Sequence, residues 1–592
     1  MKNTLSIFFN RQFSVKPLRK FSELFDHFSF VEKLIFLVLG SLLAISCLFL
    51  LLFINNAFLV EVPKAGGTLR EGIVESPKFI NPLLAFSDTD RDMTALIYSG
   101  LLKATPDGAL VPDLAESYDV SSDKLVYTFI LKNNLYFHDG AKLTADDVLF
   151  TINKAQDSTL KSLRRANWEG VVVEKVDDHT IKFTLSKPYA LFLQNTTIGI
   201  LPKHLWKDVL SEHFTFSPLN INPIGSGPFK LSSVSKNKLT GAPESYRLVP
   251  FNQYALKAPM ISIETYFYNN EKELLDALAS GSIDSASSIT PKNSTFLKIN
   301  GKLDDKKIVS SPLPRTFAVF FNQNQNKALS YKEVRLALSI LTDKEQIVAE
   351  VLEGFGTPID SVIPPSLLKT SPATDTQQAK ESSESRVTRA KKVLESNGWV
   401  WSVANSRYEK KIKKEVIPLS FSLSTSEAPE LKATAELLRA NWAQAGIEVA
   451  VKVFETGDFT ANIIGPRKYD GLLYGEVIDQ NLDLYAFWHS SQRKDPGLNI
   501  ALYTNSIADK LLEDGRTATD REVRLEKYRA FSKEIDNDIP AIFLYTPSFI
   551  YIVPQNLGGI TLGEVPTPSE RFLSANSWYL ETDSVWKIFV NQ

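Results

Sequence analysis

Two stretches, AESYDVSSDKLVYTF at residues 115–129 and FHDGAKLTADDVLF at residues 137–150, decide the fold of this chain. Apolar and polar residues alternate, imperfectly, over Leu125–Leu131, and this alternation predicts a strand. Thr144 precedes two acidic residues and an apolar face, so we expect a helix to begin there with Thr144 as its N-cap. The cleaner alternation at Thr180–Leu185 predicts a second strand.

Further elements follow along the chain without a regular rhythm. Ser330–Glu333 has the capping-box pattern and predicts an apolar helix after it. A helix over Glu430–Ala445 is expected to end at Gly446 and to lead into a strand at Ile447–Val451. Residues 370–386 are polar, so we expect a solvated loop. Strands and helices mixed without a strict βαβ order, and without an internal repeat, predict α/β lobes with mixed sheets.

Length and composition exclude several classes of protein. A chain of 592 residues is too long for one compact core, so two or three lobes are expected. The 66 basic and 68 acidic residues nearly cancel, which argues against a nucleic-acid-binding protein. The single cysteine, Cys47, excludes an intramolecular disulfide, a thiolate zinc site and a CxxC redox centre.

The N-terminal region contains one long apolar stretch. Leu34–Ile54 has 21 residues without a charge, and as a helix it would be about 31 Å long, the thickness of a bilayer's hydrocarbon core. Six basic residues and three acids precede it. The positive-inside rule therefore predicts that residues 1–33 are cytoplasmic, that residues 34–54 form a transmembrane anchor, and that a linker at residues 55–64 leads to an extracytoplasmic body.

Two other interpretations of this region remain open. A cleaved signal peptide has a shorter apolar stretch and a small-residue cleavage site, which residues 55–60 do not offer. Cys47 follows Ala44-Ile45-Ser46 as in a lipoprotein cleavage box, but apolar residues continue after it. We therefore expect an uncleaved anchor.

The chain offers little sign of catalysis. The motifs GxxxxGK[ST], GxGxxG, HExxH and GxSxG do not occur in it. Gly225-Ser226-Gly227-Pro228 is interpreted as a tight turn before a strand, and His138 beside Asp139 as structural. We therefore predict no catalytic residues, no metal site and no cofactor. The 37 Phe, 19 Tyr and 8 Trp residues favour a large recognition cleft in addition to a core.

The two opening stretches resemble the signature of the family 5 extracellular solute-binding proteins, which are the peptide- and oligopeptide-binding components of ABC importers. Later blocks agree with this family in the same order, over about residues 65–560: Gly225–Leu231, Gly281–Asp284, Phe320–Asn322, Val334–Ser339, Gly354–Pro358, Ile363–Pro365, Ala390–Leu394 and Ile539–Tyr545.

The resemblance implies a two-lobed, periplasmic-binding-protein-like clamshell. Lobe 1 is expected at residues 65–325 and 530–592, with an extra subdomain at residues 99–217, and lobe 2 at residues 326–529. The resemblance also implies a protein without enzymatic activity that captures short peptides and delivers them to the permease subunits of an ABC transporter. The predicted anchor would hold it at the cytoplasmic membrane, and we expect a monomer.

One ligand-binding residue follows from the same resemblance. In peptide-binding members a carboxylate four residues after a glycine receives the peptide's α-ammonium group, and Asp479 stands in that position after Gly475. An ammonium group that leaves water requires such a partner. The pattern departs at Glu476, where a tryptophan is usual, and at Asp483-Leu484, which replaces Asp-Pro. Asp483 is therefore the second candidate, and a capping or surface role for Asp479 stays open.

Alternatives for the function also stay open. The solute of such a binding protein could be an oligosaccharide, a metal chelate or a signalling peptide. An extracytoplasmic hydrolase is disfavoured by the missing motifs, and a sensory or scaffold protein would need a partner because residues 1–33 are too few for a catalytic domain.

Overall fold

The computed structural model describes residues 28–189, 192–299, 301–363, 381–478, 483–495, 497–518, 520–563 and 565–590. The chain divides into two compact units. One combines the N-terminal segment up to Lys64 with Glu581–Gln592, and the other, the body, is Ala65–Leu580.

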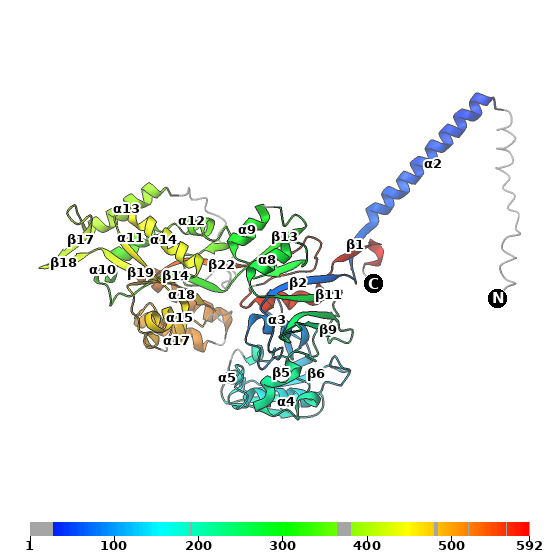
Figure 1. Ribbon diagram of the computed structural model, residues 1–592, viewed down its shortest axis with the longest axis horizontal. Coiled ribbons are helices and arrows are strands. Elements are labelled where there is room, and N and C mark those ends of the chain that lie inside the picture. The colour runs from blue at the N-terminus through cyan, green and yellow to red at the C-terminus, as the bar shows by residue number, and fades with distance from the viewer. Residues whose placement is uncertain are drawn as a thin grey trace. The chain divides into compact units, whose positions relative to one another are not determined.

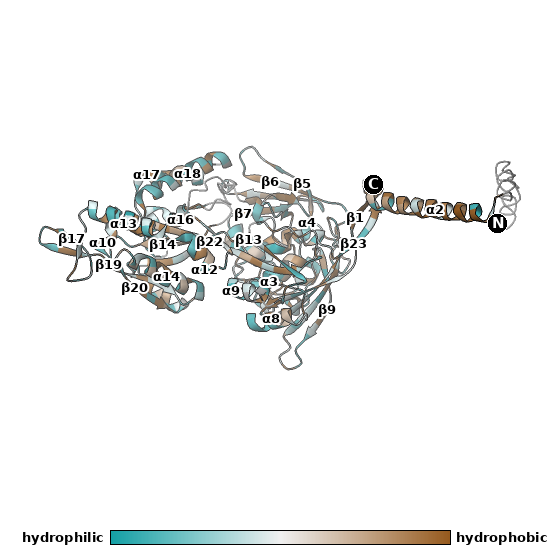
Figure 2. Ribbon diagram, turned by 90° about the horizontal axis from the view of Figure 1, so that it is seen from above, coloured by the Kyte–Doolittle hydropathy of each residue, from teal (hydrophilic) through white to brown (hydrophobic). Residues whose placement is uncertain are grey.

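The N-terminal unit contains the predicted apolar helix. Helix α2, Phe30–Phe58, is longer than the predicted span and begins with a capping box formed by Ser29 and Glu32. Most of its residues are exposed and apolar, and Figure 2 shows the helix mostly brown. By length and composition α2 could cross a membrane, although a signal sequence near an N-terminus has the same features. The predicted linker at residues 55–64 is wrong. Residues 55–58 continue α2, and Leu59–Lys64 form a strand, β1, that pairs with β23, Glu581–Trp586. A short helix, η6, Lys587–Phe589, follows β23.

The body is organised around one long strand, β22, Ala541–Pro554. Among the described residues the largest sheet has the order β20-β19-β21-β14-β22-β12-β2-β11-β10-β9, with β13 and β15 also paired to β22. Figure 1 labels β19, β14, β22, β2, β11 and β9 of this sheet. β2 is parallel to β11 and β12, whereas β22 is antiparallel to β12, β13, β14 and β15. The prediction of mixed sheets with helices is therefore confirmed.

The first part of the body carries the strands on one side of this sheet. Its elements are β2 (Thr68–Val74), α3 (Asp88–Ile97), β9 (Phe229–Lys236), β10 (Pro243–Pro250), β11 (Ser262–Tyr268), α8 (Glu271–Ala279), β12 (Ser285–Ser287), α9 (Pro291–Ile299), β13 (Lys306–Pro312) and η5 (Pro568–Ser577).

Residues 99–217, the predicted subdomain, hold a separate four-stranded antiparallel sheet in the order β5-β6-β8-β7. The predicted strands are β6 and β8, and the predicted helix is α4, which Thr144 caps together with Asp147. The elements of this region and its exit are β3 (Leu102–Ala104), β4 (Leu110–Pro112), β5 (Ala115–Val120), β6 (Val126–Leu131), α4 (Ala145–Gln156), α5 (Arg165–Trp168), β7 (Val171–Lys175), β8 (Thr180–Leu185), α6 (Phe192–Asn195), α7 (Lys203–Trp206), η1 (Ser211–Phe216) and η2 (Pro218–Asn220).

The second part of the body covers both faces of the strands around β14 with helices. Its elements are β14 (Arg315–Phe321), α10 (Lys327–Ser330), α11 (Lys332–Leu341), α12 (Lys344–Glu350), β15 (Gly356–Pro358), α13 (Ser383–Ser396), β16 (Val400–Ser402), β17 (Arg407–Ile412), β18 (Glu415–Pro418), β19 (Ser420–Ser426), α14 (Pro429–Ala443), β20 (Glu448–Phe454), α15 (Thr456–Asp458), η3 (Phe459–Ile464), β21 (Gly471–Val477), α16 (Tyr485–Trp488), η4 (Ser490–Gln492), α17 (Ser506–Thr517) and α18 (Arg521–Asp538).

Two local predictions in this part need correction. The capping box at Ser330–Glu333 is wrong, because Tyr331 is the N-cap of α11 and the Ser330 hydroxyl donates instead to the Lys327 carbonyl at 2.7 Å. Of the predicted loop, residues 370–380 lie outside the described residues, and Ser383–Arg386 form the first turn of α13. The predicted end of α14 is confirmed, since Gly446 has a left-handed φ of 83° and donates to the Ala443 carbonyl.

The chain crosses between the two parts of the body at two neighbouring points. One is the short link from β13 to β14, and the other lies within β22. The Leu313 amide donates to the Pro547 carbonyl at 2.9 Å and joins the two crossings. We propose that the lobes meet here, so that lobe 2 includes β14 and α18, whose Phe531 and Ile535 pack in the same core as Phe320. Residues 581–592, placed in lobe 1 by the sequence, cluster with the N-terminal unit.

Candidate functional site

A cavity of about 670 Å³ lies where the subdomain meets α3 and η5. It is lined by residues from segments far apart in the chain, including the end of α3, the strands β3 and β4, the region around α5, the loop after α6, and η5. Sites for small ligands have volumes of about 300–1,000 Å³, so the cavity is large enough for a small solute.

Three basic side chains line this cavity: Arg91 on α3, Lys103 on β3 and Arg164 just before α5. Arg91 forms a long ion pair with Asp88 at 3.4 Å. Lys103 Nζ donates to Asn576 Oδ1 at 3.2 Å, and burial lowers the pKa of its ammonium group while Asp113 opposes that change. These cations can attract an anionic group of a ligand.

The opposite charge comes from Asp113, which directly follows β4 and is only 2% exposed. Burial raises the pKa of its carboxyl group to about 6, although Lys103 favours the charged form. Asp113 Oδ1, Ser99 Oγ and Thr94 Oγ1 are buried and lack a hydrogen-bond partner of good geometry among the described residues. Since buried polar groups are normally paired, Thr94 Oγ1 is available to a bound molecule or to water, whereas Asp113 and Ser99 also interact with each other and with Tyr254.

Aromatic rings complete the wall of the cavity. Tyr98, Trp168, Tyr254 and Phe572 line it, and Trp168 is one of the largest fully buried side chains of the body. An apolar, aromatic lining with a few charged groups of both signs suits a zwitterionic solute, whose apolar parts can be buried while its charged ends are paired.

Of the two carboxylates predicted to bind the ligand, Asp483 does not line this cavity. Asp479 lies outside the described residues. Asp483 Oδ2 lies 3.3 Å from Arg516 Nη2, and its Oδ1 accepts from the Tyr485 amide at 3.3 Å. The described geometry therefore gives Asp483 a local role at the start of α16, and the assignment of both residues to the ligand stays a prediction.

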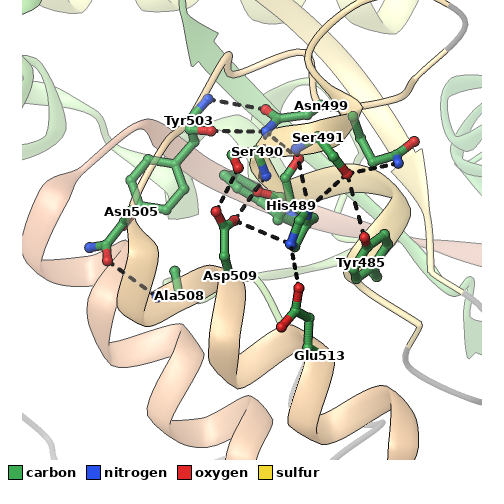
Figure 3. A network of polar contacts seen from close by, with 12 residues as sticks. Tyr485, His489, Ser490, Ser491, Asn499, Tyr503, Asn505, Ala508, Asp509 and Glu513 are labelled. Atoms are coloured by element: carbon green, nitrogen blue, oxygen red, sulfur yellow. Dashed lines mark hydrogen bonds and ion pairs between the residues drawn. The ribbon is translucent and has the colours of Figure 1, made fainter.

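A network of polar contacts holds the loop that follows α16 (Figure 3). The His489 ring stacks on Tyr485 with centroids 4.2 Å apart, its Nδ1 lies 2.8 Å from Ser491 Oγ, and its Nε2 lies 3.3 Å from Glu513 Oε1. The same Nδ1 accepts from the Ser491 amide and so caps η4. This is a short-range side-chain-to-backbone contact of the kind that ends loops and starts helices, so we assign His489 a structural role.

Asn499 and Asp509 extend the network on either side. The Asn499 amide group donates to the carbonyls of Trp488, His489 and Tyr503, each at 3.1 Å. Asp509 on α17 accepts from the Ser490 amide and hydroxyl at 2.8 and 2.6 Å (Figure 3). Within the described residues, no group of three or more His, Cys, Asp or Glu side chains is arranged to hold a metal ion.

Comparison with known proteins identifies the family. The sequence model of the bacterial extracellular solute-binding proteins, family 5, matches residues 109–506, well over half of the chain. The chain belongs to this family. The two-lobed periplasmic-binding-protein fold is confirmed with it.

Individual members of family 5 resemble the chain over nearly their whole length. The oligopeptide-binding protein AppA of Bacillus subtilis is 29% identical over 526 residues, which cover 88% of this chain and 92% of AppA. The crystal structure of AppA with a nonapeptide has a TM-score of 0.61 and 27% identity, covering 88% of this chain and all of that one. The ABC transporter substrate-binding protein CtaP of Listeria monocytogenes has a TM-score of 0.69 and 27% identity over the same shares.

The cavity residues of this family 5 protein were missed by sequence reasoning. Arg91 and Asp113 are separated from Tyr254 and Phe572 by long stretches of chain, and no local pattern links them. A weak signal exists at Asp113, which stands between apolar residues Val111-Pro112 and Leu114 in a position where an exposed acid is unexpected.

Proposed function

We propose that this protein is a membrane-anchored, extracytoplasmic binding protein that captures peptides and delivers them to the permease of an ABC transporter. The observation that carries the proposal is the relationship to AppA, an oligopeptide-binding protein, over 92% of its length. The cavity supports it, because Arg91, Lys103 and Arg164 can pair with a peptide's carboxylates.

Binding would act through the hinge between the lobes. Two crossings close together allow two rigid lobes to rotate toward each other, and a ligand that contacts both lobes favours the closed state. In this proposal Asp479 contributes from lobe 2 and the cavity from lobe 1. The protein would change the solute's location and leave its covalent bonds unchanged.

Helix α2 would hold the body at the outer face of the cytoplasmic membrane. Its 29 residues are about 44 Å long as a helix, enough to cross the hydrocarbon core with turns to spare. A tethered binding protein has a high effective concentration near its permease, which is the physical advantage of an anchor over free diffusion.

A second candidate solute is a small metal chelate. The structure of NikZ from Campylobacter jejuni in complex with Ni(L-His) matches with a TM-score of 0.61 and 25% identity. The cationic side chains of the cavity could hold the carboxylate of such a chelate without direct metal ligation.

Mass spectrometry of the ligands released from the purified full-length protein tests the proposal. A set of short peptides, confirmed by calorimetric titration with synthetic copies, is expected. Recovery of a histidine chelate, or of sugars, together with no heat from any peptide, would overturn the peptide assignment.

A further inference from the structure

The C-terminal strand pairs with the segment that directly follows the apolar helix. β1 follows α2 directly, and it pairs in antiparallel register with β23 from Leu59 opposite Trp586 to Lys64 opposite Glu581. The last turn of α2, the paired strands β1 and β23, and η6 all belong to the N-terminal unit. The C-terminal segment is therefore placed at the helix end that would leave the membrane.

Trp586 joins the C-terminal strand to that helix end. Its indole Nε1 donates to Asn55 Oδ1 at 2.9 Å, and its ring centroid lies 6.3 Å from that of Phe58. Asn55 and Phe58 both belong to the end of α2. A tryptophan with an apolar ring and a polar N–H is the side chain that membrane proteins favour at the boundary between lipid and water.

The residues after Trp586 expose apolar side chains in an unusual density. Ile588 is 65% exposed, Phe589 61% and Val590 43%, and Lys587 is the one charged residue among them. Large exposed apolar side chains grouped in this way mark a surface that contacts another apolar phase. A neighbouring lysine is compatible with a bilayer surface, because its charge can reach phosphate groups while its methylenes stay among the lipids.

We propose that Trp586–Val590 is a second membrane contact that inserts into the outer leaflet at the level of the lipid headgroups. The proposal rests on α2 crossing the membrane as described above, and the partner is the phospholipid bilayer itself, since the segment is continuous with the helix end that enters it. The pairing of β1 with β23 joins this segment to the end of α2.

Fluorescence quenching in vesicles tests this contact. The full-length protein with Cys47→Ser and Val590→Cys is labelled with an environment-sensitive fluorophore and reconstituted into phosphatidylcholine–phosphatidylglycerol vesicles. Lipids with a spin label near the headgroup should quench this label severalfold more than the same label on Thr582→Cys, an exposed position on β23 opposite Pro63. Iodide in the water should quench the two labels in the reverse order.

Equal quenching of both labels by iodide, with no effect of the lipid quencher, would overturn the inference. If the labelled protein floats with the vesicles in that case, α2 is an anchor and only the second contact is wrong. If it does not float, the anchor itself fails. Peptide binding by calorimetry is expected to be unchanged in both labelled variants, so a failure of the peptide assignment is recognised separately.

A second variant tests the pairing of β1 with β23. Trp586→Phe removes the indole N–H and keeps an apolar ring, so it should speed amide hydrogen exchange in β1 at least severalfold. Unchanged exchange in β1 would show that Trp586 does not hold the strand to the helix.

Discussion

Glu476 lies opposite Thr316 where β21 pairs with β14, and both side chains are buried. Both oxygens of Glu476, the Thr316 hydroxyl and the Trp488 indole nitrogen lack a hydrogen-bond partner of good geometry among the described residues. Burial raises the pKa of Glu476 well above its ordinary value, with Trp488 opposing. A carboxyl group in this position is neutral in the folded protein, and it lies close in sequence to the predicted anchor Asp479.

Replacing Glu476 with glutamine should stabilise the protein near neutral pH. Because the folded protein holds the proton more tightly than the unfolded chain, wild-type stability falls as the pH rises above the ordinary carboxyl pKa. Glu476→Gln removes this loss, and we expect a gain of more than about 1 kcal/mol at pH 7, because each unit of pKa difference between the folded and unfolded states corresponds to about 1.4 kcal/mol. Urea unfolding at pH 4.5 and 7 measures it, and a gain of the same size at both values would contradict the assignment.

Arg571 should be essential for the stability of the first lobe. Its guanidinium group is fully buried and pairs with Asp92 at 2.7 Å and with Glu71 at 3.0 Å, and Tyr551 donates to Glu71 at 2.8 Å. Arg571→Met leaves two buried carboxylates without a cation, which costs about 3–5 kcal/mol. Thermal unfolding checks this.

Arg439→Met is the matched control, because Arg439 is exposed and, among the described residues, forms an ion pair only with Glu436 on its own helix. Its loss should cost less than about 1 kcal/mol. Equal effects of the two substitutions would show that the buried network around Arg571 contributes little.

His138 should make the protein sensitive to acid. Its Nδ1 accepts from the Gly225 amide at 3.3 Å, its Nε2 lies 3.0 Å from the Gly227 carbonyl, and burial lowers its pKa from 6.5 to about 4. The unfolded chain therefore takes up a proton first, so the contribution of His138 is present above pH 6.5 and is lost as the pH falls toward 4.

Substitution by glutamine tests this pH dependence, because a glutamine side chain in place of His138 offers one donor and one acceptor at similar positions. His138→Gln should reduce the loss of unfolding free energy between pH 6.5 and 4 by up to about 3 kcal/mol. His213→Gln, at an exposed histidine, should leave the profile unchanged. Parallel profiles for all three proteins would refute the role of His138.

The sequence predicts features that depend on residues near in the chain and misses those that depend on distant residues. The start of α4 at Thr144 and the strand Thr180–Leu185 depend on neighbours a few residues away, and both are confirmed. The sequence predicts a linker where β1 lies because the partner of β1 is β23, at the other end of the chain. The predicted capping box fails at Glu333 because its carboxylate binds Lys410, which no local pattern reveals.

The candidate site shows the same division more sharply. The sequence does not distinguish a buried aspartate such as Asp113 from an exposed one, and only folding brings Asp113 beside Lys103 and Tyr254. The ligand contacts predicted at Asp479 and Asp483 came from family resemblance, and the local contacts of Asp483 with Arg516 could not be inferred from spacing.

Three carboxylates can now be compared as partners of a peptide's α-ammonium group: Asp479, Asp483 and Asp113. If one of them pairs with the ammonium, acetylating the peptide's N-terminus should weaken binding to the wild-type protein by about 2 kcal/mol or more, roughly thirtyfold. The alanine variant of the true partner should weaken binding of the free peptide to a similar extent and abolish the difference between free and acetylated peptides.

We expect this behaviour for Asp479→Ala. Asp483→Ala should retain the difference, because its carboxylate is engaged with Arg516 and the Tyr485 amide. Calorimetric titration of both peptides against each variant, with circular dichroism to confirm folding, separates the three. A difference that disappears in Asp113→Asn and persists in Asp479→Ala would move the ammonium site into the first-lobe cavity.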